Sequence, residues 1–381
     1  MAERDFDVTV YCRKHDSFPS DENDFPEGFR ASVVYFHNPL QTFWGNLLWK
    51  ILCVLRLGSA FPVADILWFL AQIWEHNRQY GKALDDVTIG ADTNGAIASF
   101  IWSGISKAKK RVFLSLELNQ AANFTHIDKI RLFLERKAYK DSSCVLVQDD
   151  ERFETLGKYC KYGHNTVFFM PNSSFKPVSE LPPTTGYFRE LLGIDKGVYK
   201  YIAAQAGMID DLVWCKELAS AFSDIDIGCA LVFHERQRRD TSDPYVQSLK
   251  QINSKNLFFS LNPLPYREID KVFQSIDIGI ACYRGDDDNF AQISMASGKL
   301  AEYLKHGKPV LMNDLDSFRR LNDGYDFGVI VDDPSDSRQI EKALTRIIQN
   351  YAHYSRNSLA CFAKEFDFGL KVRPFLNFLE T

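Results

Sequence analysis

The chain has 381 residues, of which 45% are hydrophobic and 25% are charged, and these shares are ordinary for a folded globular protein. They exclude a disordered, collagen-like or coiled-coil chain, and the length suggests two or three domains. The formal net charge of −5 provides no general positive field, so the composition argues against a nucleic-acid-binding protein.

The cysteines and the N-terminus bear on the cellular compartment. The eight cysteines form no C-x-x-C pair and no zinc-ligand spacing, which predicts reduced thiols that act as small core hydrophobes. The chain begins MAERDFD and lacks the basic and apolar regions of a secretory signal. We therefore expect a cytoplasmic protein.

The first half of the chain alternates short apolar runs with longer amphipathic ones. Strands are expected at 7–12, 31–36, 87–91, 111–116, 144–148 and 166–170. Each run is followed by a polar or glycine-containing turn and usually by a helical pattern. Continuous apolar strands that alternate with helices predict a parallel sheet covered on both faces.

Residues 43–74 depart from this alternation. They hold four of the six Trp and are strongly apolar, but Lys50, Arg56 and Asp65 interrupt them. No charge-free stretch reaches the ~20 residues that a membrane span needs. Trp, Phe and Leu mixed with Lys and Arg suit a helix pair that lies on a bilayer surface or faces an acceptor, whereas buried core helices account for the same composition. The sequence leaves both interpretations open.

A second series of strands follows a linker. The linker is residues 171–186, PNSSFKPVSELPPTTG, which carry four of the 14 prolines. Strands are then expected at 199–205, 227–233, 256–261, 278–283, 309–312 and 328–331. The tail from about 353 is helical and aromatic.

This organisation predicts an α/β fold with two Rossmann-like, doubly wound halves that face a central cleft. A ligand should bind in that cleft, at the carboxyl ends of the parallel strands. We expect domains at 1–178 and 179–352, and a C-terminal helix at 353–381 that packs back on the first domain. No Walker A loop, G-x-G-x-x-G turn or G-x-S-x-G elbow occurs, which argues against a dinucleotide-dependent dehydrogenase.

The stretch 292–310 carries the most informative pattern. A helix should begin near Ser297, be capped by Gly307 and stop before Pro309. Ser294, Ser297 and the free N–H groups of the first turn would face the cleft, where a helix N-terminus binds phosphate.

Two charged residues follow on that helix. Lys299 and Glu302 are three positions apart, so they share one face. A cation near a diphosphate and a carboxylate that accepts two ribose hydroxyls would together grip a nucleotide. The alternative is an ion pair between the two residues on a solvated helix.

The run S-x-K-L-x-E-Y-L-x-x-G-x-P-V at 297–310 resembles the nucleotide-sugar motif of retaining GT-B glycosyltransferases, of the glycosyltransferase family 4 type. Other segments resemble that family in the same order along the chain, namely VTIGADTNGAIAS (87–99), RVFLSLELN (111–119), ERKAYKDSSCVLVQDDERFETL (135–156) and FFMPNSSF (168–175). Ser294 stands where the family's E-x7-E motif has its first Glu, and a Ser there resembles the polysaccharide-biosynthesis members.

The resemblance implies roles for single residues. Glu302 would hold the ribose hydroxyls, Gly207 would let the diphosphate approach, and residues 284–289 would line the donor sugar. The donor-nucleotide site would comprise Gly207, Leu264, Tyr266, Ser294, Ser297, Gly298, Lys299, Leu300 and Glu302. The catalytic, charge-stabilising residues would be Glu302, Lys299 and Arg284.

The acceptor side is less marked. Asp92, Glu117, His126 and His37 could face an acceptor, or each could be a cap, turn or core-edge residue. Leu116 replaces the His that the family has before the position of Glu117.

The cations also depart from the family pattern. The family often has Arg or Lys shortly after the glycine at 207, whereas Met208, Ile209 and two aspartates follow it here. The diphosphate must therefore find its cation elsewhere, and Arg284, Arg236 and Lys299 are the candidates.

By this resemblance, the protein is a metal-independent retaining hexosyltransferase that uses a nucleotide-sugar, with a UDP-sugar favoured over a GDP-sugar. Its acceptor would be a glycan or a lipid-linked molecule. Such enzymes need no protein nucleophile, because the leaving diphosphate can take the acceptor's proton while the protein stabilises its charge. No cofactor and no metal is expected.

Two alternatives remain, a nucleotide-sugar epimerase of the same fold and a catalytically inactive binding or partner subunit. The predicted location is the cytoplasm, with peripheral attachment to the inner face of a membrane if residues 43–74 dock there.

Overall fold

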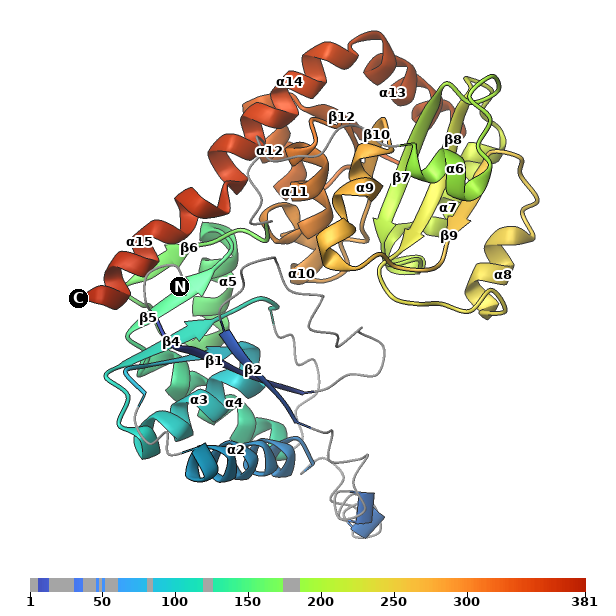
Figure 1. The fold of residues 1–381 in the computed structure, drawn as a ribbon. Coiled ribbons are helices and arrows are strands. Elements are labelled where there is room, and N and C mark those ends of the chain that lie inside the picture. Colours follow the sequence, from blue (N-terminus) through green and yellow to red (C-terminus); the bar gives the residue numbers. More distant parts are fainter. Residues whose placement is uncertain are drawn as a thin grey trace. The chain divides into compact units, whose positions relative to one another are not determined.

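The computed structural model describes residues 6–13, 31–36, 46–47, 50–51, 61–80, 85–118, 126–173 and 186–381 (Figure 1). The described chain divides into two compact units. The first runs to Met170 and also includes Val372–Thr381, and the second is Pro171–Lys371. The predicted linker at 171–186 lies mostly outside the described residues, as do His37 and much of the segment 43–74.

The first unit contains a parallel four-stranded sheet in the order β3-β4-β5-β6. Its strands are β3 (Val87–Ala91), β4 (Lys110–Leu114), β5 (Cys144–Val147) and β6 (Val167–Phe169). A separate parallel pair consists of β1 (Val8–Arg13) and β2 (Ala31–Phe36). The helices are α2 (Phe61–Tyr80), α3 (Asp92–Ser106), α4 (His126–Lys140) and α5 (Asp150–Cys160).

Alternating side chains cover both faces of this sheet. Phe113 and Val145 pack with residues of α3, α4 and α5 on one face. Their strand neighbours Val112 and Leu146 pack on the other face against α15 (Phe368–Glu380), through Phe375 and others. The C-terminal end of α15 is held by Lys110, whose Nζ donates to the carbonyl oxygens of Phe378 (2.5 Å) and Leu379 (3.1 Å).

The second unit contains a six-stranded parallel sheet in the order β12-β11-β10-β7-β8-β9. Its strands are β7 (Tyr201–Gly207), β8 (Cys229–Glu235), β9 (Leu257–Ser260), β10 (Ile278–Ala281), β11 (Val310–Asn313) and β12 (Gly328–Val331). Strand order reverses between β7 and β10, which is where doubly wound sheets bind ligands, outside the carboxyl ends of the strands.

Helices of ordinary and short length connect these strands. They are α6 (Tyr187–Leu192), α7 (Cys215–Ser223), α8 (Pro244–Lys250), α9 (Asp270–Gln274), α10 (Asp288–Ala291), α11 (Gly298–Lys305), α12 (Asp316–Tyr325), α13 (Ser337–Gln349) and α14 (Tyr351–Cys361). Short 3-10 turns lie at Asp211–Val213, Tyr266–Glu268 and Ser294–Ala296, and a π-helical turn at Phe362–Phe366 precedes α15.

The α/β class and the two series of parallel strands are confirmed, because every expected strand is a strand in the structure within a few residues. The cysteines that the structure describes are all free, and all but Cys12 are buried, as core thiols should be. None of the helices in the described part of the chain combines the length and apolar character needed to cross a membrane.

Candidate functional site

The candidate site lies at the carboxyl ends of β7 and β10. Gly207 ends β7 with φ of +115°, which a residue with a side chain rarely adopts, and a Cβ there would meet no atom of the described residues within 4 Å. The backbone at Gly207 therefore borders open space. A ligand can approach it as closely as van der Waals contact allows.

Helix α11 begins at the same edge. Ser297 is its N-cap, and the Ser297 Oγ accepts a hydrogen bond from the Leu300 N–H at 3.2 Å, as the sequence pattern predicts. Gly298 is exposed, and a Cβ there would also meet nothing within 4 Å. The first turn thus presents free N–H groups and the positive end of the helix dipole to open space. Leu300 itself buries its side chain in the core.

Two further contacts hold this helix start in place. The Tyr283 hydroxyl lies 2.6 Å from the Ser297 Oγ, so the segment just after strand β10 fixes the cap. Ser294 is buried in the 3-10 turn that precedes the cap. Asn172 anchors that turn, donating from its N–H to the Met295 carbonyl (2.9 Å) and from its Nδ2 to the Ala296 carbonyl (2.7 Å).

Lys299 is a half-buried cation at this helix start. Its Nζ donates to the Oε1 of the fully buried Gln205 at 2.6 Å and lies 4.4 Å from the centre of the Tyr283 ring. Among the described residues it forms no ion pair with a carboxylate. Burial lowers the pKa of Lys299 to about 8, and the charge of Asp210 offsets this only in part. An ammonium group with neutral partners in such a place favours an anionic ligand.

Glu302 belongs to a different cluster on the same helix. Its Oε2 lies 3.5 Å from Lys305 Nζ and 3.8 Å from His306 Nδ1. Asp270 completes the cluster, with its Oδ1 at 3.1 Å from Lys305 Nζ and 3.2 Å from His306 Nε2. Burial raises the pKa of Glu302, although the charges of Lys305 and His306 act to lower it. Lys299 and Glu302 therefore have separate partners and do not form the solvated ion pair that was one interpretation.

The same cluster raises the question of a metal. Within the described residues, Asp270, Glu302 and His306 are the one group of three potential ligands that comes together, with ligand atoms within 4.8 Å of one another. However, the buried Lys305 ammonium already lies in contact with both carboxylates. Because this group supplies the positive charge, the residues do not fit a metal ion.

The loop expected at the nucleotide base lies close to this cluster. Tyr266 starts the 3-10 turn before α9, and Leu264 packs against the core with part of its surface free. Burial, together with the charges of Glu302 and Asp270, raises the pKa of Tyr266 to about 12. The Tyr266 phenol thus lies within electrostatic reach of the Glu302 carboxylate.

Arg284 is fully engaged by other residues. It ion-pairs with Glu217, its Nε donates to the Asp211 carbonyl at 2.9 Å, and its guanidinium lies 4.1 Å from the centre of the Trp214 ring. Its positive charge is therefore already matched by a carboxylate. This distinguishes it from Lys299.

Comparisons with known proteins bear on the fold. No protein-family model and no curated protein matches the sequence. Among solved structures, the chain is similar to sucrose-phosphate synthase from Thermosynechococcus elongatus, with a TM-score of 0.70 and 14% identity over 100% of this chain and 90% of that one. It is similar to Anabaena HepE in complex with UDP and glucose, with a TM-score of 0.67 and 13% identity over 99% and 100%.

A third similar structure is WaaG, a glycosyltransferase involved in lipopolysaccharide biosynthesis, with a TM-score of 0.62 and 13% identity over 98% of this chain and 91% of that one. In each case the similarity spans both units. The chain has the GT-B fold. At these identities the likeness establishes the fold, and the chemistry must be argued from the residues.

In the first unit of this GT-B fold, Asp92 and Glu117 come together at the carboxyl edge of the sheet. Asp92 starts α3 with φ of +52°, and its Oδ1 accepts from the N–H groups of Leu116 (2.7 Å) and Glu117 (3.0 Å). The Leu116 carbonyl in turn accepts from Arg152 at 2.9 Å. His126 is the first residue of α4, and its side chain lies outside the described part of the structure.

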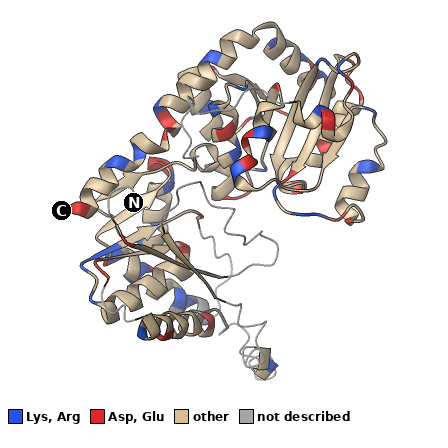
Figure 2. Cartoon of the chain, in the orientation of Figure 1, with Lys and Arg blue, Asp and Glu red and all other residues tan. Residues whose placement is uncertain are grey.

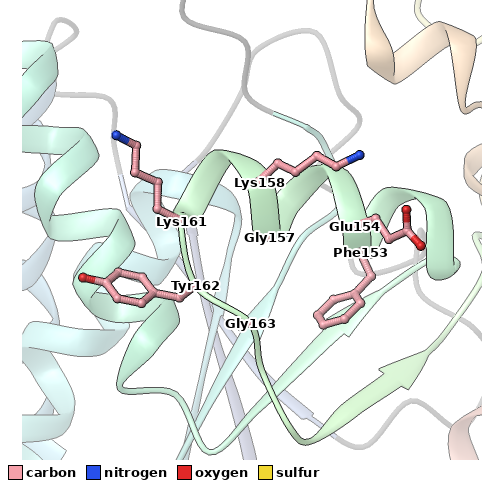
Figure 3. Close-up of a pocket in the computed structure, with 7 residues that line it drawn as sticks. All are labelled: Phe153, Glu154, Gly157, Lys158, Lys161, Tyr162 and Gly163. Carbon is pink, nitrogen blue, oxygen red and sulfur yellow. The ribbon is translucent and has the colours of Figure 1, made fainter.

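The first GT-B unit also has a shallow hollow of about 390 Å³ beside the C-terminal end of α5. It is lined by Phe153, Glu154, Gly157, Lys158, Lys161, Tyr162 and Gly163 (Figure 3). The ammonium groups of Lys158 and Lys161 point away from each other in this view, so the hollow does not concentrate charge. None of the sequence-predicted site residues lines it.

The residues that hold the side chains of the candidate site in place were not predicted from the sequence. Gln205, near the end of β7, binds Lys299, and Tyr283, just after β10, binds Ser297. Asp270 and Lys305 lie beside Glu302. A Gln inside the otherwise apolar strand run YIAAQAG was a signal for Gln205, because a polar residue in an apolar run needs a partner. Asp270 gave no such signal.

Proposed function

We propose that the protein is a glycosyltransferase that transfers a sugar from a UDP-sugar to a glycan or lipid-linked acceptor with retention of configuration. The observation that carries the proposal is Lys299, a half-buried ammonium at the start of α11, near the open backbone of Gly207. In the part of the chain that the structure describes, it has no carboxylate partner. The similar fold of HepE, which was solved in complex with UDP-glucose, supports the choice of nucleotide.

The donor would bind along this edge in three parts. Its diphosphate would lie against Gly207, the N–H groups at Gly298 and the Lys299 ammonium, where the helix dipole and the cation add. Its ribose hydroxyls would donate to the Glu302 carboxylate, and its base would lie by Tyr266. Each part of the donor then meets a group of complementary charge or hydrogen-bonding character.

The reaction needs charge stabilisation rather than a protein nucleophile. The bond between the anomeric carbon and the diphosphate oxygen breaks, and the acceptor oxygen forms the new bond to that carbon on the same face. The acceptor's proton passes to the leaving diphosphate oxygen. Lys299 and the start of α11 would stabilise the negative charge that develops on this oxygen, a type of contribution that is often the largest in enzyme catalysis. No step requires a metal ion.

The acceptor would meet the first unit. Asp92 and Glu117 lie together at the carboxyl edge of its sheet, and Glu117 is exposed there. We propose Glu117 as the acceptor-contacting group of the pair, because its side chain is exposed at this edge.

A nucleotide screen with the full-length protein tests the proposal. UDP should stabilise the protein against heat more than GDP, ADP or CMP. A ligand at 100 times its Kd adds about 2.7 kcal/mol to the free energy of unfolding, so binding is visible as a higher melting temperature. A UDP-sugar panel with glycan and lipid-linked acceptors should then give a product of retained configuration. Failure to bind any of the four nucleotides would overturn the proposal.

A nucleotide-sugar-binding subunit without transferase activity is the second candidate. The engagement of Arg284 by Glu217 favours it, because one cation expected to act on the donor is occupied. UDP binding without turnover of any donor across the acceptor panel would select this function instead.

We further propose that part of the segment 43–74 docks on an anionic membrane. One face of α2 is core, since Ile66, Leu70 and Ile73 pack against α3, yet Leu67 and Trp74 on the neighbouring stripe of the helix are more than half exposed. Arg78 lies 5.7 Å from the centre of the Trp74 ring, at the end of this stripe. It pairs with Glu75 at 3.0 Å, but both side chains are exposed, so its guanidinium can also meet anionic headgroups.

Flotation with vesicles that contain phosphatidylglycerol tests this docking. The protein should float at low salt, and the Leu67→Ser, Trp74→Ser double variant should stay at the bottom of the gradient. Because both side chains are exposed, this variant should fold normally. Absence of flotation of the unchanged protein at low salt would refute the docking.

A further inference from the structure

We propose that Arg236 is the second cation of the donor site and that its guanidinium binds the phosphate oxygens of the nucleoside diphosphate opposite Lys299. The inference rests on the proposed function, whose donor carries more than one negative charge. Lys299 supplies one positive charge, and a helix N-terminus adds the equivalent of about half of one. A diphosphate leaving group therefore calls for another cation at the same edge.

Most cations near this edge already have carboxylate partners. Arg284 pairs with Glu217, and Lys305 is buried between Asp270 and Glu302. Arg239 lies 3.3 Å from Glu235 and 3.3 Å from Asp243, and it also donates to the Ile209 carbonyl. Binding a phosphate with any of these would mean breaking an existing ion pair.

Arg236 has no such partner. Its side chain is exposed, and within the described part of the chain no ion pair involves it. Lys and Arg alternate with Asp and Glu along the ribbon of the second unit (Figure 2).

The backbone places Arg236 directly beside the open glycine. Strand β8 pairs with β7 so that Glu235 is opposite Gly207, and the Arg236 N–H donates to the Gly207 carbonyl at 2.8 Å. Arg236 therefore leaves the sheet at the point where a diphosphate would approach Gly207. A side chain of arginine length can reach a ligand bound there.

Electrostatics connects Arg236 to the start of α11. Burial raises the pKa of Tyr283, and the positive charge of Arg236 acts on the same phenol to lower it. The Tyr283 hydroxyl lies 2.6 Å from the Ser297 Oγ, and the Tyr283 ring lies beneath Lys299. The positive charges of Arg236 and Lys299 thus both lie near Tyr283, in the region of the Ser297 N-cap and Gly207.

Arginine is also the suitable residue for this role. Its planar guanidinium offers paired N–H donors that match two phosphate oxygens, and it remains charged throughout the pH range in which Lys299 titrates.

The test compares Arg236→Gln with Arg238→Gln in the full-length protein. Arg238 is exposed in the same loop, so its loss removes the same charge from nearly the same place. Arg236→Gln should weaken UDP binding about tenfold, as expected for a charged hydrogen-bonding pair, and should leave uridine binding unchanged. Arg238→Gln should change UDP affinity by less than about threefold.

The kinetic readout adds a second criterion. Because the leaving group gains charge in the transition state, Arg236→Gln should lower kcat as well as raise KM, and Arg236→Lys should restore part of both. Equal UDP affinity in Arg236→Gln and in the unchanged protein would overturn the inference, as would equal losses in the two glutamine variants. If the unchanged protein does not bind UDP, it is the proposed function that fails.

Discussion

The carboxyl edges of the two sheets use their polar residues in opposite ways. In the first unit, Asp92, Gln148 and Arg152 all bind the backbone of the loop 115–117. In the second unit, the partners of Lys299 among the described residues are an amide and an aromatic ring, and Gly207 and Gly298 border open space there. One edge, the closed edge, uses these three side chains to hold its own loop, and the other edge leaves a cation for a ligand.

The difference shows how structural polar groups can be told from binding groups. A polar side chain whose hydrogen-bonding capacity is used by the backbone stabilises the loop that it holds. A half-buried charge without a counterion bears a desolvation cost that a ligand of opposite charge can relieve. The predictions below alter single residues at the two edges, where the effects should differ in kind.

The largest effect is expected from Glu302→Ala. Loss of two hydrogen bonds from ribose hydroxyls to a charged group should cost ~3 kcal/mol, which is about a hundredfold in the Kd for UDP. Uridine should lose a similar factor, because the ribose contact is common to both ligands. Isothermal titration calorimetry measures both.

The variant should still fold, because Lys305 retains Asp270 as a partner at 3.1 Å. Glu341→Ala is the matched control, since Glu341 is an exposed carboxylate on α13 of the same unit. Unchanged UDP affinity in Glu302→Ala, with the native melting temperature preserved, would show that Glu302 does not contact the nucleotide. It would also weaken the contrast between a first edge that holds its own loop and a second edge that binds a ligand.

A smaller effect that depends on pH is expected from Lys299→Met. It should weaken UDP binding by ~2 kcal/mol, about thirtyfold, and leave uridine binding nearly unchanged. Since burial holds the pKa of Lys299 at about 8, a bound diphosphate should raise that pKa again and draw in a proton. UDP affinity of the unchanged protein should therefore fall as pH rises through about 8.

Calorimetry in buffers of different ionisation enthalpy detects this proton uptake near pH 8, and Lys299→Met should lack it. The same shift has a stability consequence. The folded pKa of about 8 lies below the ordinary value of 10.5, so the folded state binds the proton more weakly than the unfolded state. The contribution of Lys299 therefore raises the free energy of unfolding as pH rises from about 8 towards 10.5. Proton uptake that persists in Lys299→Met would assign it to another group.

The strands and the start of α11 could be predicted from sequence because they depend on local pattern. The run IGIACY at 278–283 is continuous and apolar, and Ile278–Ala281 is the buried strand β10. The cap at Ser297 follows from a Ser before a good helix-forming run, and its Oγ does accept from the Leu300 N–H. Such signals act over a few residues and need no knowledge of tertiary contacts.

The partners of the site residues could not be predicted, because they come from distant segments. Glu217 pairs with Arg284 across 67 positions, and Gln205 binds Lys299 across 94. No periodicity links such positions; only the completed sheet brings them together. The expectation for Arg284 was therefore formed without its partner, whereas Lys299 could be named from its helix alone.

The smallest effect is expected from Asp92→Asn at the closed edge. Asn accepts the same two backbone N–H groups through its Oδ1 and tolerates the left-handed backbone at φ of +52°, so the free energy of unfolding should change by less than about 0.5 kcal/mol. Asp92→Ala removes the acceptor and keeps the unfavourable φ, and it should cost ~1.5 kcal/mol. Urea unfolding measures both.

Transfer activity then separates the two roles that Asp92 could have. If Asp92 only holds the loop 115–117, Asp92→Asn should retain activity, because the loop and the exposed Glu117 stay in place. If the Asp92 charge itself contacts the acceptor, activity should fall in Asp92→Asn while stability does not. That outcome would show that a carboxylate bound to the backbone can still contact an acceptor. The two edges would then differ in how much binding capacity their polar groups retain, and not in whether they retain any.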